Sequence, residues 1–416
     1  MSRSGLAWVP LLEPRESSPK YLHHKMSTVI GTHSGAFQAD EALGVWLLRR
    51  LDRFGGLAAT VVRSRDMKVL EGLPIVIDVG GIYSHDALRY DHHQRGFFET
   101  FDGTVGVATG PETATGKFKT KLSASGLVYK HYGREILCVL HPSLQESPDK
   151  LDWVWDKMYI EFMEAIDGND NGIEIADEMR YKDATSLPNR VHRLNSRWNE
   201  PEGGPTEDER FEKASTLCGE EFAATLDYIV NCELPARDVV EAALRSRAVR
   251  ARDSNPRPSR CGSRQRLHRA SSRLLTPASH PGLDTLGPLL RGLGVRILIV
   301  QEVDPSGEVI VFTSGGCPWK THLYELERTH GVEPLVKFVL YEDSSGMWRV
   351  QAVTAEGTSF TNRLGLLESW RGLRDAELTA AAGIEGCKFC HATGFIGGNA
   401  TYAGALAMAM KTIQSS

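Results

Sequence analysis

Short apolar segments alternate with helical patterns through residues 27–167, and this alternation most constrains the fold. The expected strands lie at residues 27–32, 59–63 and 74–77, and the expected helices at 123–132 and 151–167. Alternating strands and helices pack as a mostly parallel sheet with flanking helices. We therefore predict an α/β domain over residues 27–244, in which ligands bind at the carboxyl ends of the strands.

A second and smaller domain is expected over residues 295–416. Its strand patterns lie at residues 295–300, 309–313, 336–341 and 348–353, and its last helix at 402–413. Strands come mostly before the final helix instead of alternating with helices, so we predict a C-terminal α+β domain.

Two segments differ from both domains. Residues 1–26 are irregular and rich in proline, without the apolar core of a secretory signal, and we predict a disordered leader. Residues 245–294 form an Arg/Ser/Pro-rich segment, with ten arginines and a single acid between 245 and 273. Such a segment has too little apolar content to fold alone. It is interpreted as a linker or insertion, and the alternative is a basic arm that contacts phosphates.

Composition excludes several classes of protein. No apolar run approaches the roughly 18 residues of a membrane-spanning helix, so no membrane partner is expected. The net charge of −5 argues against a globally basic nucleic-acid binder, although a local basic groove is compatible with it. The seven cysteines are scattered, which indicates reduced thiols in an intracellular protein.

Side chains that can bind metals follow the expected strands. His33 comes directly after the first strand, and Asp78 follows the buried run at 74–77. The stretch RYDHHQRG (89–96) places an aspartate before two histidines; at a strand end, alternate members of that triplet can converge on one ion. A polar surface turn is the other interpretation of the triplet. The candidates are His33, Asp40, Asp78, Asp91, His92, His93, Asp167 and Asp170.

The residue types in this set point to a transition-metal site. Imidazole together with carboxylate suits Mn²⁺, Fe²⁺ or Zn²⁺ better than Ca²⁺ or Mg²⁺. So many ligands exceed what one ion needs, whereas two ions about 4 Å apart, bridged by a carboxylate, would use them. Such a pair of ions is suited to cleaving phosphate esters.

Several ordered motifs carry a resemblance to a known family. The chain resembles the MYG family, the melanocyte proliferating gene product and its relatives, which is akin to the DHH phosphoesterases. The motifs in the first domain are IGTHSGAFQADEAL (30–43), VIDVGG (76–81), RYDHHQRGF (89–97), KLSASGLVYKHYG (121–133) and EAIDGNDNGI (164–173). Those in the second are GGCPWKTHLYELE (315–327), WRVQAV (348–353), WRGLRD (370–375) and HATGFIGGNAT (391–401).

The resemblance implies a 3′→5′ RNA exonuclease of mitochondria and nuclei that uses Mn²⁺. It also implies a DHH phosphoesterase-like metal domain and a C-terminal domain that binds substrate. The implied metal ligands are His33, Asp40, Asp78 as the bridge, His92 and Asp167. His93 would face the substrate, with Asp91 orienting an imidazole and Asp78 acting in catalysis. The implied substrate contacts are Arg95, Lys320, His391, Gly397 and Gly398.

The sequence departs from the family in three places. The motif F-H-x-D-E has Gln38 where a second imidazole is expected, and an amide oxygen is a much poorer ligand for a transition metal. One of the two Mn²⁺ ions is therefore expected to bind weakly. Cys390 replaces the valine before His391, and residues 245–291 interrupt the family pattern.

Alternative functions stay open at this point. CKFCH (387–391) has the form of a c-type haem attachment sequence, but the Gly-rich turn after it favours coincidence. The same metal chemistry could serve a hydrolase of small phosphoesters or pyrophosphate. A non-catalytic RNA-binding or regulatory protein, with a site weakened at Gln38, is the third alternative.

Overall fold

The computed structural model describes residues 28–247 and 306–416, and contacts divide the chain into two units, Met1–Ile229 and Val230–Ser416. The predicted leader, the strand at 295–300 and all but the first three residues of the 245–294 segment lie outside the described residues. The division falls earlier than the predicted boundary at residue 244. The reason is helix α8 (Leu234–Arg247), whose Val240 and Leu244 pack in an apolar cluster of the second unit.

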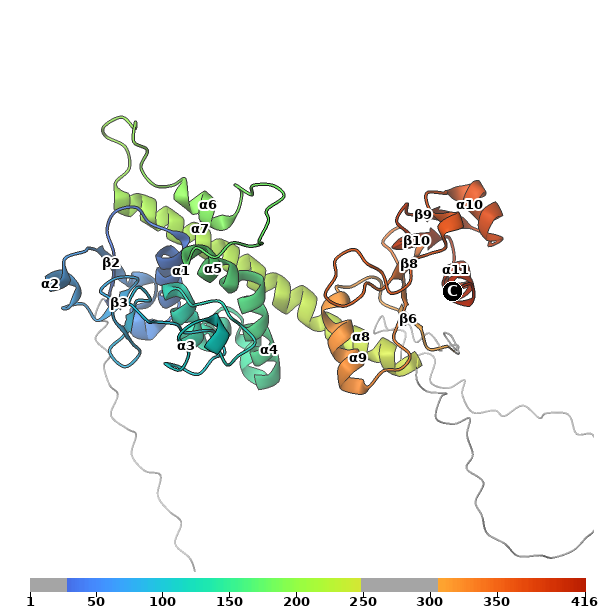
Figure 1. The fold of residues 1–416 in the computed structure, drawn as a ribbon, viewed down its shortest axis with the longest axis horizontal. Coiled ribbons are helices and arrows are strands. Elements are labelled where there is room, and N and C mark those ends of the chain that lie inside the picture. Colours follow the sequence, from blue (N-terminus) through green and yellow to red (C-terminus); the bar gives the residue numbers. More distant parts are fainter. Residues whose placement is uncertain (1–27, 248–305) are drawn as a thin grey trace, which may run out of the picture. The chain divides into compact units, whose positions relative to one another are not determined.

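The first unit contains the predicted, mostly parallel sheet (Figure 1). Its strands are β1 (Val29–Thr32), β2 (Thr60–Arg63), β3 (Ile75–Ile77), β4 (Tyr83–Ser84) and β5 (Arg89–Tyr90). The strand order is β2-β1-β3-β5-β4, with parallel pairing everywhere except between β4 and β5. All three residues of β3 are buried, as expected for a strand covered on both faces. The α/β class is confirmed.

Helix α1 (Ala39–Leu48) is buried in the first unit, where it packs mainly against α3 and α7 and also contacts α5 and α6. The other helices are α2 (Met67–Leu70), α3 (Ala124–Leu140), α4 (Pro148–Met158), α5 (Glu164–Asp170), α6 (Leu187–His192) and α7 (Glu207–Tyr228). In α1 even Asp40 and Glu41 are buried. A buried carboxylate is costly unless it is paired or binds a cation, and both of these lie in the first turn of α1.

The helix predicted at 151–167 has a break in its hydrogen-bond pattern. Residues Tyr159–Met163 form a π-helical turn between α4 and α5. A π turn adds a residue to the helix, so the side chains after it rotate relative to those before it. The direction in which the acids of α5 point is therefore set by this turn, which the sequence pattern does not predict.

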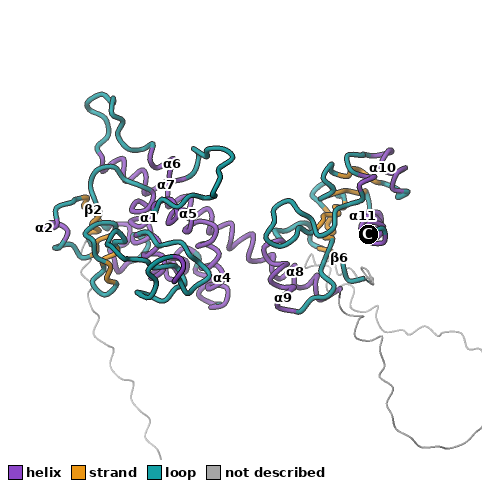
Figure 2. The backbone as a smooth tube through the Cα atoms, viewed as in Figure 1, coloured by secondary structure: helices purple, strands orange, loops and turns teal. Residues whose placement is uncertain are grey.

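The second unit is the expected smaller α+β domain, in which β6 pairs parallel with β7 and the remaining pairs are antiparallel. Its strands are β6 (Val309–Phe312), β7 (Phe338–Glu342), β8 (Trp348–Ala352), β9 (Cys387–Cys390) and β10 (Ile396–Asn399). Its helices besides α8 are α9 (Lys320–His330), α10 (Asp375–Ala382) and α11 (Tyr402–Gln414). Figure 2 separates these strands and helices by colour. Among the described residues, no helix is long and apolar enough to cross a membrane.

Candidate metal centre

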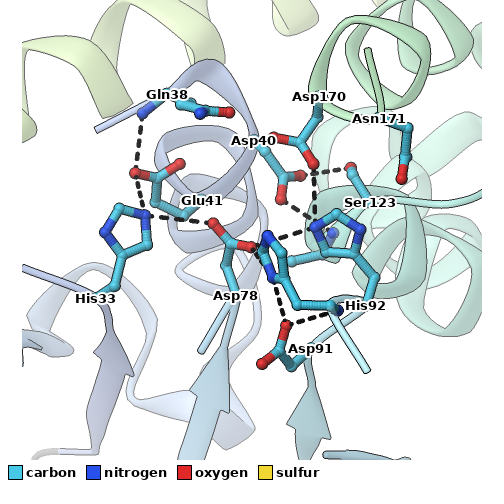
Figure 3. A network of polar contacts seen from close by, with 12 residues as sticks. His33, Gln38, Asp40, Glu41, Asp78, Asp91, His92, Ser123, Asp170 and Asn171 are labelled. Atoms are coloured by element: carbon cyan, nitrogen blue, oxygen red, sulfur yellow. Dashed lines mark hydrogen bonds and ion pairs between the residues drawn. The ribbon is translucent and has the colours of Figure 1, made fainter. Parts of the chain in front are cut away.

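Three neighbouring parallel strands deliver the metal-binding candidates to one edge of the first sheet. His33 follows β1, Asp78 follows β3, and the triplet beginning at Asp91 follows β5. Because β1, β3 and β5 are adjacent and parallel, their carboxyl ends meet there. The N-terminus of α1 and the end of α5 bring further carboxylates to the same place (Figure 3).

The side chains form three groups whose potential ligand atoms lie within 4.8 Å of one another. The groups are His33 with Glu41 and Asp78, Asp78 with His92 and His93, and Asp40 with His92 and Asp170. Asp78 belongs to two groups, and so does His92. The three groups therefore form one connected centre, which has enough potential ligands for more than one ion.

Asp78 directs one oxygen toward each half of the centre. Its Oδ2 lies 3.4 Å from His33 Nε2, and its Oδ1 lies 3.4 Å from His92 Nε2. The residue has a φ of 56°, in the left-handed region that Asp and Asn tolerate better than most side chains. This backbone bend at the end of β3 gives the carboxylate the geometry of a bridging ligand.

The two buried histidines are held among carboxylates. Burial acts to lower their pKa values, but interactions with neighbouring carboxylates outweigh it and raise both to about 10: Asp78 and Glu41 beside His33, Asp170 and Asp78 beside His92. Burial would raise the pKa of Asp78, yet the two imidazoles lower it. His33 also has the Ser34 carbonyl 3.2 Å from its Nδ1, which leaves Nε2 to face the carboxylates.

The atoms that make no hydrogen bond indicate that a metal fits here. Glu41 Oε2 is buried without a hydrogen-bond partner. Asp78 Oδ1 and Asp170 Oδ2 lie 3.4 Å and 3.0 Å from His92 Nε2, but none of these three buried atoms makes a bond with good hydrogen-bond geometry. Polar atoms are costly to bury in this way unless something binds them. Imidazole and carboxylate donors converging on one position are the ligands that Mn²⁺, Fe²⁺ and Zn²⁺ accept. The residues present therefore fit a transition-metal centre.

Comparison with known proteins identifies the family of the chain. The family model MYG1_exonuc, described as "Uncharacterised protein family (UPF0160)", matches residues 29–255 and 295–413. The chain belongs to this family. A MYG1 protein of Dictyostelium discoideum is 38% identical over 390 residues, covering 93% of this chain and 97% of the relative. Proteins named MYG1 exonuclease are 40% identical in Bos taurus (97% of this chain, 89% of the relative) and 39% in Homo sapiens (92% and 85%).

The DHH triplet of this MYG1-family chain divides as a strand end allows. His92 is buried and faces Asp78 and Asp170, whereas the side chain of His93 is 62% exposed. Asp91 Oδ1 lies 2.7 Å from His93 Nδ1, and its Oδ2 accepts the Gly81 N–H. Burial would raise the pKa of Asp91, but the hydrogen bond from His93, with help from Gly81, lowers it to about 2. The geometry thus matches the expected pair of an orienting carboxylate and an imidazole.

Asp40 belongs to the metal centre and also accepts hydrogen bonds from the residues at the start of α3. Its Oδ1 accepts hydrogen bonds from Ser123 Oγ and the Ser125 N–H, and its Oδ2 accepts the Ala124 N–H. Burial first, and then the nearby Asp170 and Asp78 carboxylates, raise the pKa of Asp40 well above its ordinary value. Asp40 therefore stands where a positive charge would be strongly favoured.

The structure gives Asp167 and Asp170 different surroundings. Asp167 is buried and fully partnered, since Oδ1 accepts from Ser123 N and Oγ and Oδ2 accepts from Tyr159 Oη. Asp170, one turn later, places Oδ2 3.0 Å from His92 Nε2. Asp170 therefore faces His92, whereas the contacts of Asp167 are those of a supporting residue, and its role as a metal ligand stays a prediction.

The sequence analysis does not predict that Glu41 lies in this centre, because an acid in the first turn of a helix is already favoured by the helix dipole. The missed signal was that α1 is apolar enough to be buried. A carboxylate in its first turn then cannot remain at the surface.

The predicted substrate contacts lie in different places. Arg95 is exposed after the DHH triplet, and Lys320 and His391 are exposed in the second unit. Gly397 and Gly398 are buried in β10, where an added Cβ would come 2.9 Å from Leu366 Cδ1 and 2.8 Å from Phe389 Cε1, respectively. Close side-chain packing thus explains why glycine stands at positions 397 and 398 without reference to a substrate. Contact with RNA stays a prediction for all five residues.

Proposed function

We propose that this protein is a metal-dependent exonuclease that shortens RNA from its 3′ end with two Mn²⁺ ions. The observation that carries the proposal is the sharing of Asp78 between the two halves of the centre, with one oxygen toward each histidine. Family membership supports it, because several relatives bear the name MYG1 exonuclease. RNA as the substrate, the 3′→5′ direction and manganese come from the resemblance and are part of the proposal.

The protein side chains have distinct roles in this reaction. His33, Asp78, His92, Asp40 and Asp170 would hold the ions, which when bound polarise the phosphodiester and lower the pKa of the attacking water. The hydrogen bond that His93 makes with Asp91 raises the pKa of His93 and outweighs burial, which acts to lower it. A protonated imidazole on the open side of the centre can donate a hydrogen bond to a phosphate oxygen, and Arg95 can attract the same phosphate.

Gln38 is proposed to leave one ion weakly bound. Replacing it by histidine offers a better donor, so Gln38→His should tighten the weaker step of a Mn²⁺ titration. Identical titrations for the variant and the parent would place residue 38 outside the ligand shell.

The test is a time course on 5′-labelled single-stranded RNA with Mn²⁺, with EDTA as one control and Asp78→Asn as the other. The proposal expects a ladder that shortens from the 3′ end and is absent from both controls. Parallel assays on dinucleotides and pyrophosphate separate it from a small-phosphoester hydrolase. Intact RNA that is nevertheless retained by the protein would favour a non-catalytic RNA-binding protein.

The compartment belongs to the same proposal: a mitochondrial or nuclear protein. Fractionation of cells that express the full chain would test it, and recovery elsewhere would contradict it.

A further inference from the structure

Glu41 lies between the start of α1 and the imidazole of His33. Its side chain is fully buried, and its Oε1 is 3.0 Å from His33 Nε2. The same oxygen accepts the backbone N–H of Gln38 at 2.9 Å, while Oε2 is buried without a hydrogen bond. Figure 3 draws the carboxylate between Gln38 and His33, with Asp78 beside it.

Helix capping explains only part of this arrangement. Capping the Gln38 N–H needs one acceptor oxygen, which a neutral glutamine would supply equally well. The capping box at the start of α7 shows the ordinary case, because Glu209 accepts the Thr206 N–H at 2.8 Å while remaining exposed. Glu41 instead buries its charge and leaves one oxygen unpartnered. Beyond the contact of Oε1 with His33, the unpartnered Oε2 favours a further positive charge beside this carboxylate.

The position of that charge follows from the neighbouring ligands. His33 Nε2, an oxygen of Asp78 and an oxygen of Glu41 lie within 4.8 Å of one another. Without Glu41, the position beside His33 would keep only two protein ligands, since residue 38 is a glutamine. We propose that Glu41 is the third protein ligand of the metal ion held by His33 and Asp78. This inference rests on the metal centre of the proposed function.

The two metal positions then differ in charge. The position beside His33 has the carboxylates of Glu41 and Asp78, whereas the position beside His92 has those of Asp40, Asp170 and Asp78. More carboxylates bind a divalent cation more tightly, so Mn²⁺ should fill the His92 position first and the His33 position second. Loss of Glu41 should affect the second step.

The experiment is a Mn²⁺ titration of the purified full chain, with free Mn²⁺ followed by electron paramagnetic resonance. The parent is expected to bind two ions in two steps. Glu41→Gln keeps a cap for Gln38 and should weaken the second step at least about 10-fold, with the first step changed less than about 3-fold. Glu209→Gln makes the same change in the exposed capping box and should leave both steps as in the parent. Asp170→Asn should weaken the first step instead.

Two steps with the parent's affinities in Glu41→Gln would overturn the inference. Failure of the parent itself to bind Mn²⁺ would instead overturn the metal centre of the proposed function, so the two failures are distinguishable. A measurement without any substitution is anomalous diffraction from Mn²⁺-soaked crystals of the parent. A Glu41 oxygen about 2.2 Å from the ion beside His33 is expected. An ion ligated by His33 and Asp78 but separated from Glu41 by more than about 3 Å would also overturn the inference.

Discussion

The sheet of the first unit ends in a cluster of buried carboxylates, whereas the strands of the second unit contribute side chains to two apolar clusters. Among the described residues, all three groups that could hold a metal lie in the first unit. The buried carboxylates there are Asp40, Glu41, Asp78, Asp91, Glu99 and Asp167. In the described part of the second unit the buried carboxylate is Glu327, which forms two hydrogen bonds with Arg363.

The two units differ in how their buried carboxylates are paired. Glu327 is matched by a guanidinium and also accepts the Val336 N–H, so its charge is satisfied within the protein. The carboxylates of the metal centre outnumber the imidazoles that face them, and Glu41 Oε2 has no hydrogen-bond partner. Buried charge that is paired holds a fold together, whereas buried charge that is incompletely paired marks a binding site.

Neutralising Asp78 should produce the largest effect and should act on activity. In Asp78→Asn we expect RNA cleavage to fall on the order of 10³-fold, because both metal positions lose a ligand. The metal-free variant should unfold with a free energy within about 1 kcal/mol of the parent, since Asn tolerates the left-handed backbone at this position. Asp78→Ala would add backbone strain, which makes asparagine the better test.

The measurements are initial cleavage rates and urea denaturation without metal. Unchanged turnover would remove Asp78 from the ligand set. A large loss of stability alongside the loss of activity would show that Asp78 also stabilises the fold, as Glu327 is expected to do in the second unit.

The matched change in the second unit should act on stability. Glu327→Gln leaves the partly buried Arg363 without its charge partner, which we expect to lower the free energy of unfolding by about 3 kcal/mol. Mn²⁺ binding measured below the unfolding transition should stay as in the parent. The control is Glu325→Gln in the same helix, because Glu325 pairs with the partly exposed Arg237 at 3.0 Å and should contribute less than about 1 kcal/mol. Equal effects of the two substitutions would contradict the assigned role of the buried pair.

The smallest expected effect concerns a partly buried histidine outside the metal centre, His131. His131 stacks on His85 and lies 2.8 Å from the Tyr83 hydroxyl. Burial first, and then His85, lower the pKa of His131 from 6.5 to about 4. Between pH 6.5 and about pH 4, His131 is protonated in the unfolded chain but neutral in the folded chain. The free energy of unfolding therefore falls as the pH falls through this range. The contribution is at most about 2 kcal/mol at pH 5.

Denaturation of parent and His131→Gln at pH 7 and pH 5 measures this contribution. The loss of stability on acidification should be smaller in His131→Gln, whereas His192→Gln, at an exposed position, should behave like the parent. The same loss in His131→Gln and the parent would contradict the prediction.

Local patterns predicted much of the fold. The strands after residues 28, 59 and 74, the parallel sheet and the α+β character of the second unit follow from alternation and apolar runs, which depend on neighbours along the chain. Strands β9 and β10 were not predicted. In β10, Gly397 and Gly398 weaken the strand pattern, and the side chains packed over them explain their place in the sheet.

The sequence by itself determined that His33, Asp78 and His92 would meet, because residues that end neighbouring parallel strands share one edge of the sheet. Only the tertiary structure decided which carboxylates borne by helices join them. The π turn before α5 and the packing at the start of α3 keep Asp167 fully partnered and bring Asp170 to His92. The burial of α1 turns Glu41 from a surface capping residue into a buried charge beside His33. Both outcomes depend on how helices rotate and pack, and the spacing of residues along the chain does not encode that.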